Sequence, residues 1–189
     1  MSLFRSAFVL AASAAVAVFV SGCSTTAPTF QPSIANVSTL KAAGSTPVAV
    51  GAFTVQAGLK TATSIQLRAA DMTTDKGSYA QYLADALKSE LDLAKRLDPK
   101  ATIEITGVLL KNDIAAGGFS TNSGEVEARF IVRRDGQVKY EKTKRGTAEW
   151  EGSFAGATAI PKAAQQYPVL VQNMLAALYA DADFVAAIR

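Results

Sequence analysis

The clearest hydrophobic pattern in the chain predicts an α-helix between Ser78 and Pro99. Large apolar residues recur there at every fourth position: Tyr79, Leu83, Leu87 and Leu91. This spacing places them on one helical face, which we expect to be buried in the core. Ser78 is a favourable N-cap, and Pro99 is expected to end the helix. Lys95 and Arg96 suit the negative end of the helix dipole.

Three segments have the composition or the alternation of β-strands. Residues 48–56 are rich in β-branched and aromatic side chains, and residues 64–70 place Ile65 and Leu67 on one face. Residues 101–110 alternate between apolar and polar side chains at first and are then apolar on both faces. A strand that is apolar on both faces is expected near the centre of a sheet.

A β-hairpin is predicted over residues 125–150, with its turn at Asp135-Gly136. A two-residue turn would mix apolar and polar side chains on each face, whereas a three-residue loop over 134–136 would separate them. The register of the three-residue loop pairs Val132 with Val138, Phe130 with Tyr140, Ala128 with Lys142, Arg129 with Glu141 and Glu125 with Arg145. One face is then apolar and the other carries complementary charges, so we predict the three-residue loop.

The C-terminal part is predicted to be helical after a small-residue loop over 152–157. Pro161 lies near the start of this helix, and Pro168 is expected to kink or restart it. Asp181 or Asp183 is expected to cap a last short turn. The order of elements is that of an α+β fold in a single domain. We predict a mixed or antiparallel sheet of four to five strands, with two main helices packed on one face.

The first 23 residues resemble the signal peptide and lipobox of bacterial lipoproteins. Arg5 is followed by an apolar run over 7–20, and the run leads into Val20-Ser21-Gly22-Cys23. In that family an aliphatic residue and two small residues precede an obligatory Cys. The run of about 14 residues is short of the ~20 that a transmembrane anchor needs. A plain secretory signal would instead leave the one Cys of the chain unpaired.

The resemblance implies that residues 1–22 are cleaved and that Cys23 carries the lipid. Its thiol would bear a diacylglycerol and its new amine an acyl chain, and two or three chains anchor a protein stably. Ser24 follows the Cys. In Gram-negative lipoproteins an Asp at that position favours the inner membrane, so Ser24 implies the outer membrane, with the domain facing the periplasm. In a host with a single membrane this last step does not apply.

Residues 23–46 are predicted to be a lipidated, flexible tether, and residues 47–189 a globular domain. Ser, Thr, Ala and Pro dominate the tether, which has almost no charge. Such a stretch buries too little apolar surface to order itself. The alternative is that Phe30 and Ile34 dock onto a partner.

The composition excludes several catalytic mechanisms. The sequence contains no His, and lipidation would consume its one Cys, so Ser-His-Asp and Cys-His catalysis are excluded. The chain contains no P-loop or dinucleotide fingerprint. Its carboxylates have no recognisable spacing, as at Asp71, Asp75, Asp113 and Glu149. Lys and Arg number 19 against 16 Asp and Glu, which gives no case for nucleic acid. Carboxylate pairs and Ser-Lys chemistry remain open to an enzyme that acts on the cell wall, which is the alternative, but we predict no enzymatic activity and no cofactor or metal.

Residues 112–124 are predicted to form a loop rich in Gly, Ser and Asn, and this loop is the candidate partner-binding site. Its named candidates are Phe119, Asn112 and Asn122. Loops carry recognition more often than the elements that they join. The alternatives are a mobile loop without a binding role, or a Phe119 that folds back onto the core.

Beyond the lipobox, the layout is similar to small Gram-negative envelope lipoproteins of the YajG-like and transport-auxiliary types. The similarity rests on the helix start at Gly77-Ser78-Tyr79, the Asp135-Gly136 hairpin and the ending over 175–188. It implies an accessory role in the envelope and no reaction. We therefore predict a membrane-anchored accessory or scaffold lipoprotein that binds another envelope protein. The alternative is a carrier of lipid or another hydrophobic ligand in a transport system, which would need an apolar cavity.

Overall fold

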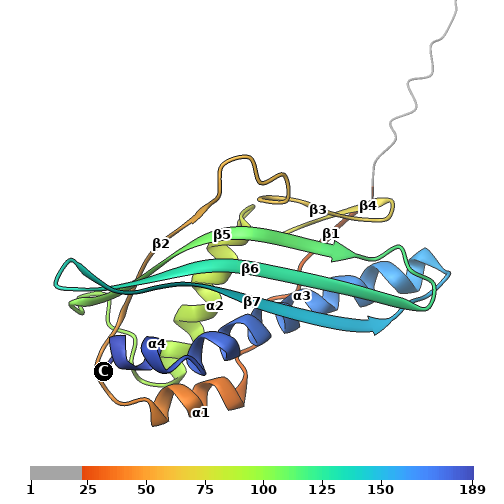
Figure 1. Cartoon of the computed structure of the whole chain (residues 1–189). Helices are drawn as coiled ribbons and strands as arrows, with labels where there is room; N and C mark the ends of the chain where they lie inside the picture. The colour runs from red at the N-terminus through yellow and green to blue at the C-terminus, as the bar shows by residue number, and fades with distance from the viewer. Residues whose placement is uncertain (1–22) are drawn as a thin grey trace, which may run out of the picture.

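The computed structural model of the protein describes residues 23–189 (Figure 1). The predicted signal peptide, residues 1–22, lies outside the described residues, and with it the lipobox residues Val20, Ser21 and Gly22.

Two β-sheets and four helices make up the described residues (Figure 1). The larger sheet has four strands in the order β2 (Ala49–Val55), β5 (Ile103–Ala115), β6 (Thr121–Arg134) and β7 (Gln137–Glu151). The smaller sheet has three, in the order β1 (Cys23–Thr26), β4 (Ala70–Thr73) and β3 (Ile65–Leu67). The helices are α1 (Ile34–Ala42), α2 (Tyr79–Leu93), α3 (Gly156–Tyr179) and α4 (Ala182–Ala187). Because β2 is parallel to β5 while the other pairs of the larger sheet are antiparallel, the predicted α+β fold with a mixed sheet is confirmed.

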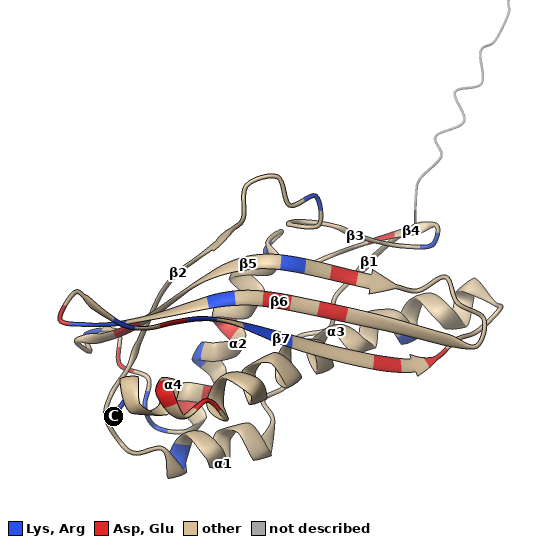
Figure 2. Ribbon diagram, in the orientation of Figure 1, with Lys and Arg blue, Asp and Glu red and all other residues tan. Residues whose placement is uncertain are grey.

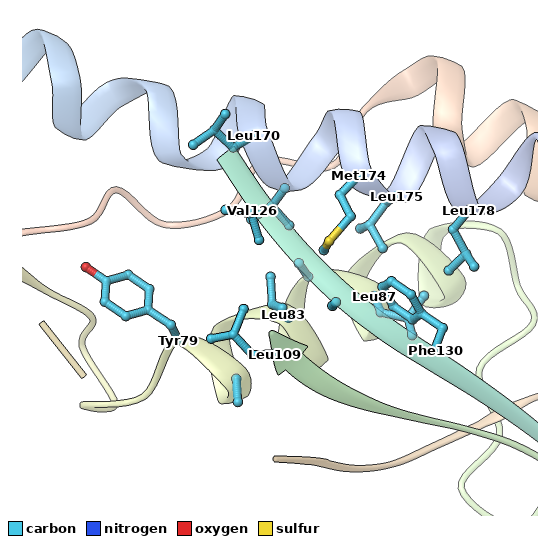
Figure 3. Close-up of a cluster of buried hydrophobic side chains, with 14 of the residues drawn as sticks. Tyr79, Leu83, Leu87, Leu109, Val126, Phe130, Leu170, Met174, Leu175 and Leu178 are labelled. Carbon is cyan, nitrogen blue, oxygen red and sulfur yellow. The ribbon is translucent and has the colours of Figure 1, made fainter. Parts of the chain in front are cut away.

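The core lies between one face of the larger sheet and the two long helices (Figures 1 and 3). Helix α2 packs against β2 and β5, and α3 packs against β6 and β7. The predicted apolar stripe of α2 is buried, as expected: Tyr79, Leu83, Leu87 and Leu91. It meets buried side chains of the sheet and of α3: Leu109, Val126, Phe130, Leu170, Met174 and Leu178 (Figure 3). Among residues 23–189, no helix covers the opposite face of the sheet (Figure 1).

Helix α3 runs close to the backbone of β7 because Gly146 has no side chain. A Cβ atom at this position would collide with the carbonyl oxygen of Leu170. A kink or a restart was predicted at Pro168; the helix is continuous through this residue, so the restart is wrong. Tyr167 and Leu170, on either side of the proline, are buried in the same core, and this packing offsets the backbone hydrogen bond that a proline removes.

Helix α2 starts as predicted and ends earlier than predicted. The Ser78 hydroxyl caps it by accepting a hydrogen bond from the backbone N–H of Gln81, at 3.3 Å. The helix ends at Leu93, well before Pro99, because Lys95 adopts a left-handed backbone with φ of 61°. This turn directs Arg96 inward, where it is 1% exposed. The sequence suggested that Arg96 interacts with the dipole of α2 from the surface. The structure instead buries Arg96 in the core.

The hairpin between β6 and β7 has a two-residue turn, so the predicted three-residue loop is wrong. Asp135 and Gly136 both have positive φ, 51° and 80°, which is the geometry of a type I′ turn. A bulge then places Lys139 as an extra residue between the pairs Arg133–Val138 and Val132–Tyr140. The bulge moves Tyr140 onto the buried face, which a regular two-residue hairpin could not do.

Beyond the bulge the register differs from the predicted one, although each residue there lies on its predicted face. Before the bulge, Val138 lies opposite Arg133 and not Val132 and is 51% exposed, so its predicted place on the apolar face is wrong. Phe130 lies opposite Lys142 and not Tyr140, and Arg129 lies opposite Thr143. Arg129 still reaches Glu141 diagonally, with 3.5 Å between nitrogen and oxygen. The outer face is therefore charge-complementary, as expected, through a different set of neighbours.

The predicted loop over 112–124 is mostly strand. Strand β5 continues to Ala115 and β6 starts at Thr121, which leaves only 116–120 as a loop. A bulge at Leu110 interrupts the pairing and shifts the alternation, so that Asn112 and Ile114 point to the buried side. The strand was predicted to end at Leu110 because the residues from 112 to 124 are rich in Gly, Ser and Asn.

The flexible tether predicted for residues 23–46 is wrong, because this segment is folded onto the domain. Cys23 starts β1, and α1 buries Leu40 to 1% exposure. The side-chain amide of Asn36 donates to the carboxylate of Glu90 at 3.2 Å, and Phe30 packs edge-on against Tyr82. Polar contacts with α2 and a few apolar ones thus order a stretch whose composition alone suggested disorder.

Candidate functional site

The predicted lipidation site, Cys23, is the first residue of β1 and belongs to the folded domain. It lies directly beside Ala70 in the parallel pairing of β1 with β4. Neighbouring strands are about 4.8 Å apart, so the backbone of Cys23 is held against the β3–β4 turn. An acyl chain on Cys23 would therefore be attached to the domain without any spacer.

Two exposed phenylalanines form an aromatic tip, which we define as the loops 116–120 and 152–155. Phe119 is 69% exposed and Phe154 is 83% exposed. Their ring centroids are 5.5 Å apart. The first loop joins β5 to β6 and the second joins β7 to α3, so the two meet at one end of the larger sheet (Figure 1).

Arg68, in the β3–β4 turn, holds both loops of the aromatic tip. Its Nε donates to the carbonyl of Ala116 at 2.8 Å. Its two terminal nitrogens donate to the carbonyls of Phe154 and Ser153, at 3.0 and 2.6 Å. The loops also bind each other through the backbone N–H of Gly152 and the carbonyl of Ser120, at 2.8 Å. These hydrogen bonds therefore hold the two loops of the aromatic tip in a defined conformation relative to each other.

Of the three residues predicted for partner binding, only Phe119 is at the surface. Asn112 is 0% exposed, and its amide donates to the carbonyl of Thr61 at 2.9 Å. Asn122 is 3% exposed, and its oxygen accepts from the backbone N–H of Gly118 at 2.7 Å. Both asparagines thus support the surrounding loops, and the assignment of Asn112 and Asn122 to a binding surface is wrong.

Sequence reasoning missed Phe154 and Arg68 as members of this surface. The loop over 152–157 was recognised as rich in small residues, and an isolated Phe in such a loop was the available signal. Nothing local marked Arg68, because its partners are 48 to 86 residues away in the sequence.

The uncovered face of the larger sheet is densely charged. Figure 2 shows Lys and Arg interspersed with Asp and Glu along β5, β6 and β7. Arg145 pairs with Glu125 at 2.8 Å and with Glu127 at 3.2 Å, and Lys111 pairs with Glu125 at 2.9 Å. A depression of about 630 Å³ lies over the same strands and is lined by Lys111, Asp113, Glu125, Thr147 and Glu149. Antiparallel sheets often leave one face in water, so the charges by themselves have a structural explanation.

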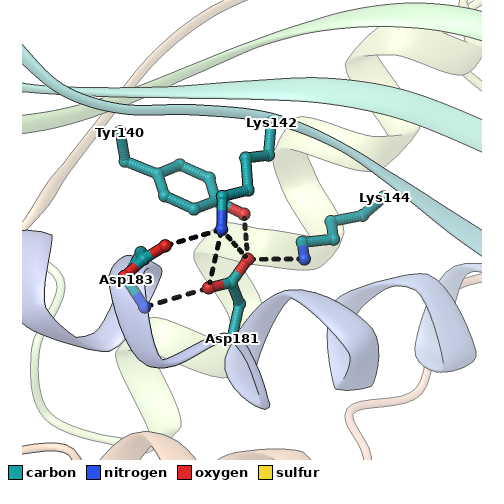
Figure 4. A network of polar contacts seen from close by, with 5 residues as sticks. All are labelled: Tyr140, Lys142, Lys144, Asp181 and Asp183. Atoms are coloured by element: carbon teal, nitrogen blue, oxygen red, sulfur yellow. Dashed lines mark hydrogen bonds and ion pairs between the residues drawn. The ribbon is translucent and has the colours of Figure 1, made fainter.

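A network of charges around Asp181 joins the start of α4 to β7 (Figure 4). Of the two predicted caps, Asp181 and not Asp183 caps this last helix, accepting from the N–H of Asp183 at 2.9 Å. It also accepts from Lys144 at 2.7 Å, from Lys142 at 3.2 Å and from the Tyr140 hydroxyl at 3.2 Å. Burial opposes its ionisation, but these hydrogen bonds outweigh burial and hold the pKa of Asp181 well below its usual range. The network fastens the C-terminal helix to the sheet.

Glu90 is a buried carboxylate between α1 and α2. It is 0% exposed, and its Oε1 accepts from the Ser33 N–H at 3.0 Å and from the Asn36 amide at 3.2 Å. Its Oε2 has no hydrogen-bond partner within residues 23–189, and the Tyr179 hydroxyl lies beside the carboxyl without a well-formed hydrogen bond. Burial raises the pKa of Glu90 above its ordinary value, against the opposing effect of these hydrogen bonds.

Changing Glu90 to Gln is expected to flatten the pH dependence of stability. Because the folded pKa of Glu90 is raised, its contribution is fully present below the unfolded value of about 4.3 and is lost as pH rises through the folded pKa. Gln keeps an acceptor for Ser33 and Asn36 and carries no charge. The free energy of unfolding in urea, measured between pH 4 and 8, checks this, with Glu149→Gln at an exposed position as the control. If the free energy of unfolding of Glu90→Gln depended on pH as strongly as that of the wild type, Glu90 would not be the source of the pH dependence.

A small cavity lies between the N-terminal segment and α2. Its volume is about 270 Å³, and its lining includes Ala27, Phe30 and Tyr82 together with Asp75 and Asp85. Sites for small molecules usually have about 300–1,000 Å³, so this cavity gives the carrier hypothesis little support.

Residues 23–189 include no group of three or more His, Cys, Asp or Glu side chains placed to hold a metal ion. Within the same residues, no helix combines the length and the apolar character that crossing a membrane requires.

No family model and no curated protein matches the chain. Among solved structures, the fold is similar to that of protein XCC0632 from Xanthomonas campestris, assigned to the family DUF330. The sequences are 14% identical, the match covers 82% of this chain and 92% of the other, and the TM-score is 0.54. At this identity the likeness shows a shared fold.

Two further structures are similar to the chain at lower scores. One is a predicted lipoprotein from Caulobacter crescentus CB15, with 10% identity, coverage of 80% of this chain and 93% of the other, and a TM-score of 0.46. The other is protein CT253 from Chlamydia trachomatis, with 11% identity, coverage of 75% and 99%, and a TM-score of 0.45.

Proposed function

We propose that the protein is a membrane-anchored accessory lipoprotein of the bacterial cell envelope that binds another envelope protein and carries out no chemistry of its own. In a Gram-negative host its anchor would lie in the outer membrane and its domain in the periplasm. The chain would be held there through lipid on Cys23, which follows Gly22 in the lipobox-like sequence.

The observation that carries this proposal is the position of Cys23 in the fold. Because Cys23 pairs with Ala70 as part of β1, anchoring would set the orientation of the whole domain. A protein confined to a surface in a defined orientation meets partners in the same envelope at a high effective concentration, so a modest interface suffices. This supports a scaffold more than a freely diffusing carrier.

The uncovered face of the larger sheet supports partner binding. It presents both signs of charge and the depression lined by Lys111, Glu125 and Glu149. Interspersed charges give an interface specificity and register through complementarity. This face offers a broader surface than the loop that the sequence suggested.

Replacing Cys23 with Ser is expected to block acylation and to leave unprocessed precursor or soluble protein. The thioether requires the sulfur, and Ser cannot form it. Mass spectrometry of the mature N-terminus is the measurement, and Ser24→Ala, which keeps the Cys, is the matched control. An unmodified Cys23 in the wild type, or cleavage at another residue, would remove the basis of the anchor.

The wild-type protein and the Cys23→Ser variant also test partner binding. A photocrosslinking residue in place of Thr143, on the uncovered sheet face, is expected to capture a defined envelope protein from wild-type cells and to lose it in Cys23→Ser. A crosslinker at Gln165, exposed on α3, serves as the control for surface position. A purified protein that turned over peptidoglycan or lipid, and lost this activity when one carboxylate was changed, would overturn the proposal of binding without chemistry.

A further inference from the structure

We propose that the aromatic tip inserts Phe119 and Phe154 into the surface of the membrane that holds Cys23, so that the domain lies directly on the bilayer. This inference rests on the proposed function, because it needs the anchor. It adds a second contact with the membrane and sets which end of the domain faces the lipid.

The first step is the short connection between the anchor and the tip. Cys23 lies beside Ala70, and Arg68 is two residues before Ala70 in the same turn. A strand rises about 3.3 Å per residue, so the anchor and Arg68 are held within a few residue lengths of each other. Since β1 starts at Cys23, no flexible segment lies between the lipid and this turn.

The second step is the fixed position of the tip relative to that turn. Arg68 donates to carbonyls of both tip loops, at 2.6 to 3.0 Å. The tip therefore cannot move away from the anchor without breaking three hydrogen bonds. In Figure 1 the β5–β6 loop and the start of α3 lie toward the end of the molecule where β4 begins, and the β6–β7 hairpin lies at the other end.

The third step is the chemistry of the tip, which fits a lipid surface. The loops 116–120 and 152–155 contain only Gly, Ala, Ser and the two Phe, with no charged residue. The loops can therefore enter the interface without burying a charge of their own, and the guanidinium of Arg68 that supports them already donates to three of their carbonyls. The nearest charged neighbour in sequence, Glu151, has a side chain that is 85% exposed and lies 3.5 Å from Lys162, so it belongs to the wet edge of the tip.

The exposure of the two rings is otherwise unexplained. The remaining large exposed apolar residues of the described chain form no aromatic pair: Ile34 and Leu93 line one hollow together, and Val138 lies on β7. Phe119 and Phe154 instead touch each other, and both are more than two-thirds exposed on a braced support. Single exposed apolar residues are normal, whereas a supported aromatic pair is typical of a contact site.

A nitroxide label tests where the tip lies. Acylation of Cys23 would consume the only thiol, so Ser120→Cys in the full chain, processed in cells and reconstituted in phosphatidylethanolamine–phosphatidylglycerol vesicles, carries one label at the tip. We expect this label to collide with dissolved oxygen more than with a water-soluble nickel chelate. A label at Gln137→Cys, on the opposite hairpin, should show the reverse.

The contribution of the rings is tested in the same vesicles. Phe119→Ser with Phe154→Ser is expected to shift the tip label toward water by at least roughly tenfold in its oxygen-to-nickel ratio, because burying one Phe side chain is worth about a tenfold change in partition. The matched control changes Ile34 and Val138 to Ser and should leave the ratio unchanged. Thermal melting confirms that each variant is folded.

Three outcomes overturn the inference, and they are distinguishable. If Cys23 is acylated and the tip label is as accessible to the nickel chelate as the label at 137, the membrane contact is rejected. The proposed function then still stands. A tip label shielded from both reagents in native envelopes shows that a protein covers the tip. One free thiol per chain in the wild type shows that Cys23 is unmodified, which rejects the anchor itself.

Discussion

Replacing Arg96 with Ala is expected to lower the free energy of unfolding by about 3–5 kcal/mol, because buried carbonyls lose a charged donor and a cavity is left in the core. Arg96 is among the largest fully buried side chains. Its guanidinium donates to the carbonyls of Thr46, Leu40 and Ile188, at 3.0, 3.3 and 2.5 Å. Alanine would leave the two buried carbonyls of Leu40 and Ile188 and the partly buried carbonyl of Thr46 without this donor, and would leave a cavity between them.

Within residues 23–189, the Arg96 guanidinium is bound by carbonyls and not by a carboxylate, and this has a physical explanation. Leu40 belongs to the last turn of α1, and Ile188 follows the last residue of α4. The carbonyls at helix C-termini lack helical partners and carry the negative end of the helix dipole. These carbonyls therefore stabilise the positively charged guanidinium as a carboxylate would. Burial lowers the pKa of Arg96, but an arginine in a protein keeps its proton.

Two variants make the test of Arg96 specific. Arg96→Lys keeps the charge, but its single ammonium cannot reach three carbonyls spread around a planar guanidinium, so it should recover only part of the loss. Lys100→Ala removes an exposed basic residue nearby and should change little. Urea unfolding measures all three variants. An Arg96→Ala protein as stable as the wild type would show that this cluster does not hold α1 and the C-terminus to the core.

Replacing Phe130 with Ala is expected to cost about 3–5 kcal/mol in the free energy of unfolding, because the ring is fully buried. Phe130 lies in the middle of β6, beneath the two long helices, and meets Phe53 edge-on with 6.0 Å between ring centroids (Figure 3). The surrounding helices and sheet cannot collapse into the space without moving their backbones, so most of the cavity would remain.

The adjacent residue provides the control. Arg129 points to the uncovered face, and its pair with Glu141 is 44% and 45% exposed. Exposed ion pairs typically contribute about 0–1 kcal/mol, so Arg129→Ala should cost several times less than Phe130→Ala. Chemical denaturation of both variants gives the comparison. If both variants lost the same free energy of unfolding, Phe130 would not be buried and Arg129 exposed as the structure describes.

Features that depend on nearby residues were predictable from the sequence. The four-residue spacing from Tyr79 to Leu91 predicted α2, because helical periodicity is a property of the segment itself. Ser78 and Asp181 act as caps, as their side chains suggested. The Asp135-Gly136 turn was located for the same reason, since few residue pairs tolerate its backbone.

Features that depend on distant residues were decided only by the tertiary structure. The bulges at Leu110 and Lys139 set the strand register through cross-strand packing, which no local pattern reports. Residues 23–46 are ordered because Glu90 and Arg96 bind their polar groups, although their own composition suggested a tether.

The candidate site divides in the same way. The sequence by itself determined the lipobox-like stretch ending in Cys23, the absence of His and the presence of an isolated Phe119, since each is a matter of residue identity. Only the tertiary structure decided that Asn112 and Asn122 are buried and that Phe154 joins Phe119. It also decided that Arg68 fixes this pair near Cys23, because that contact joins loops from three separate parts of the chain.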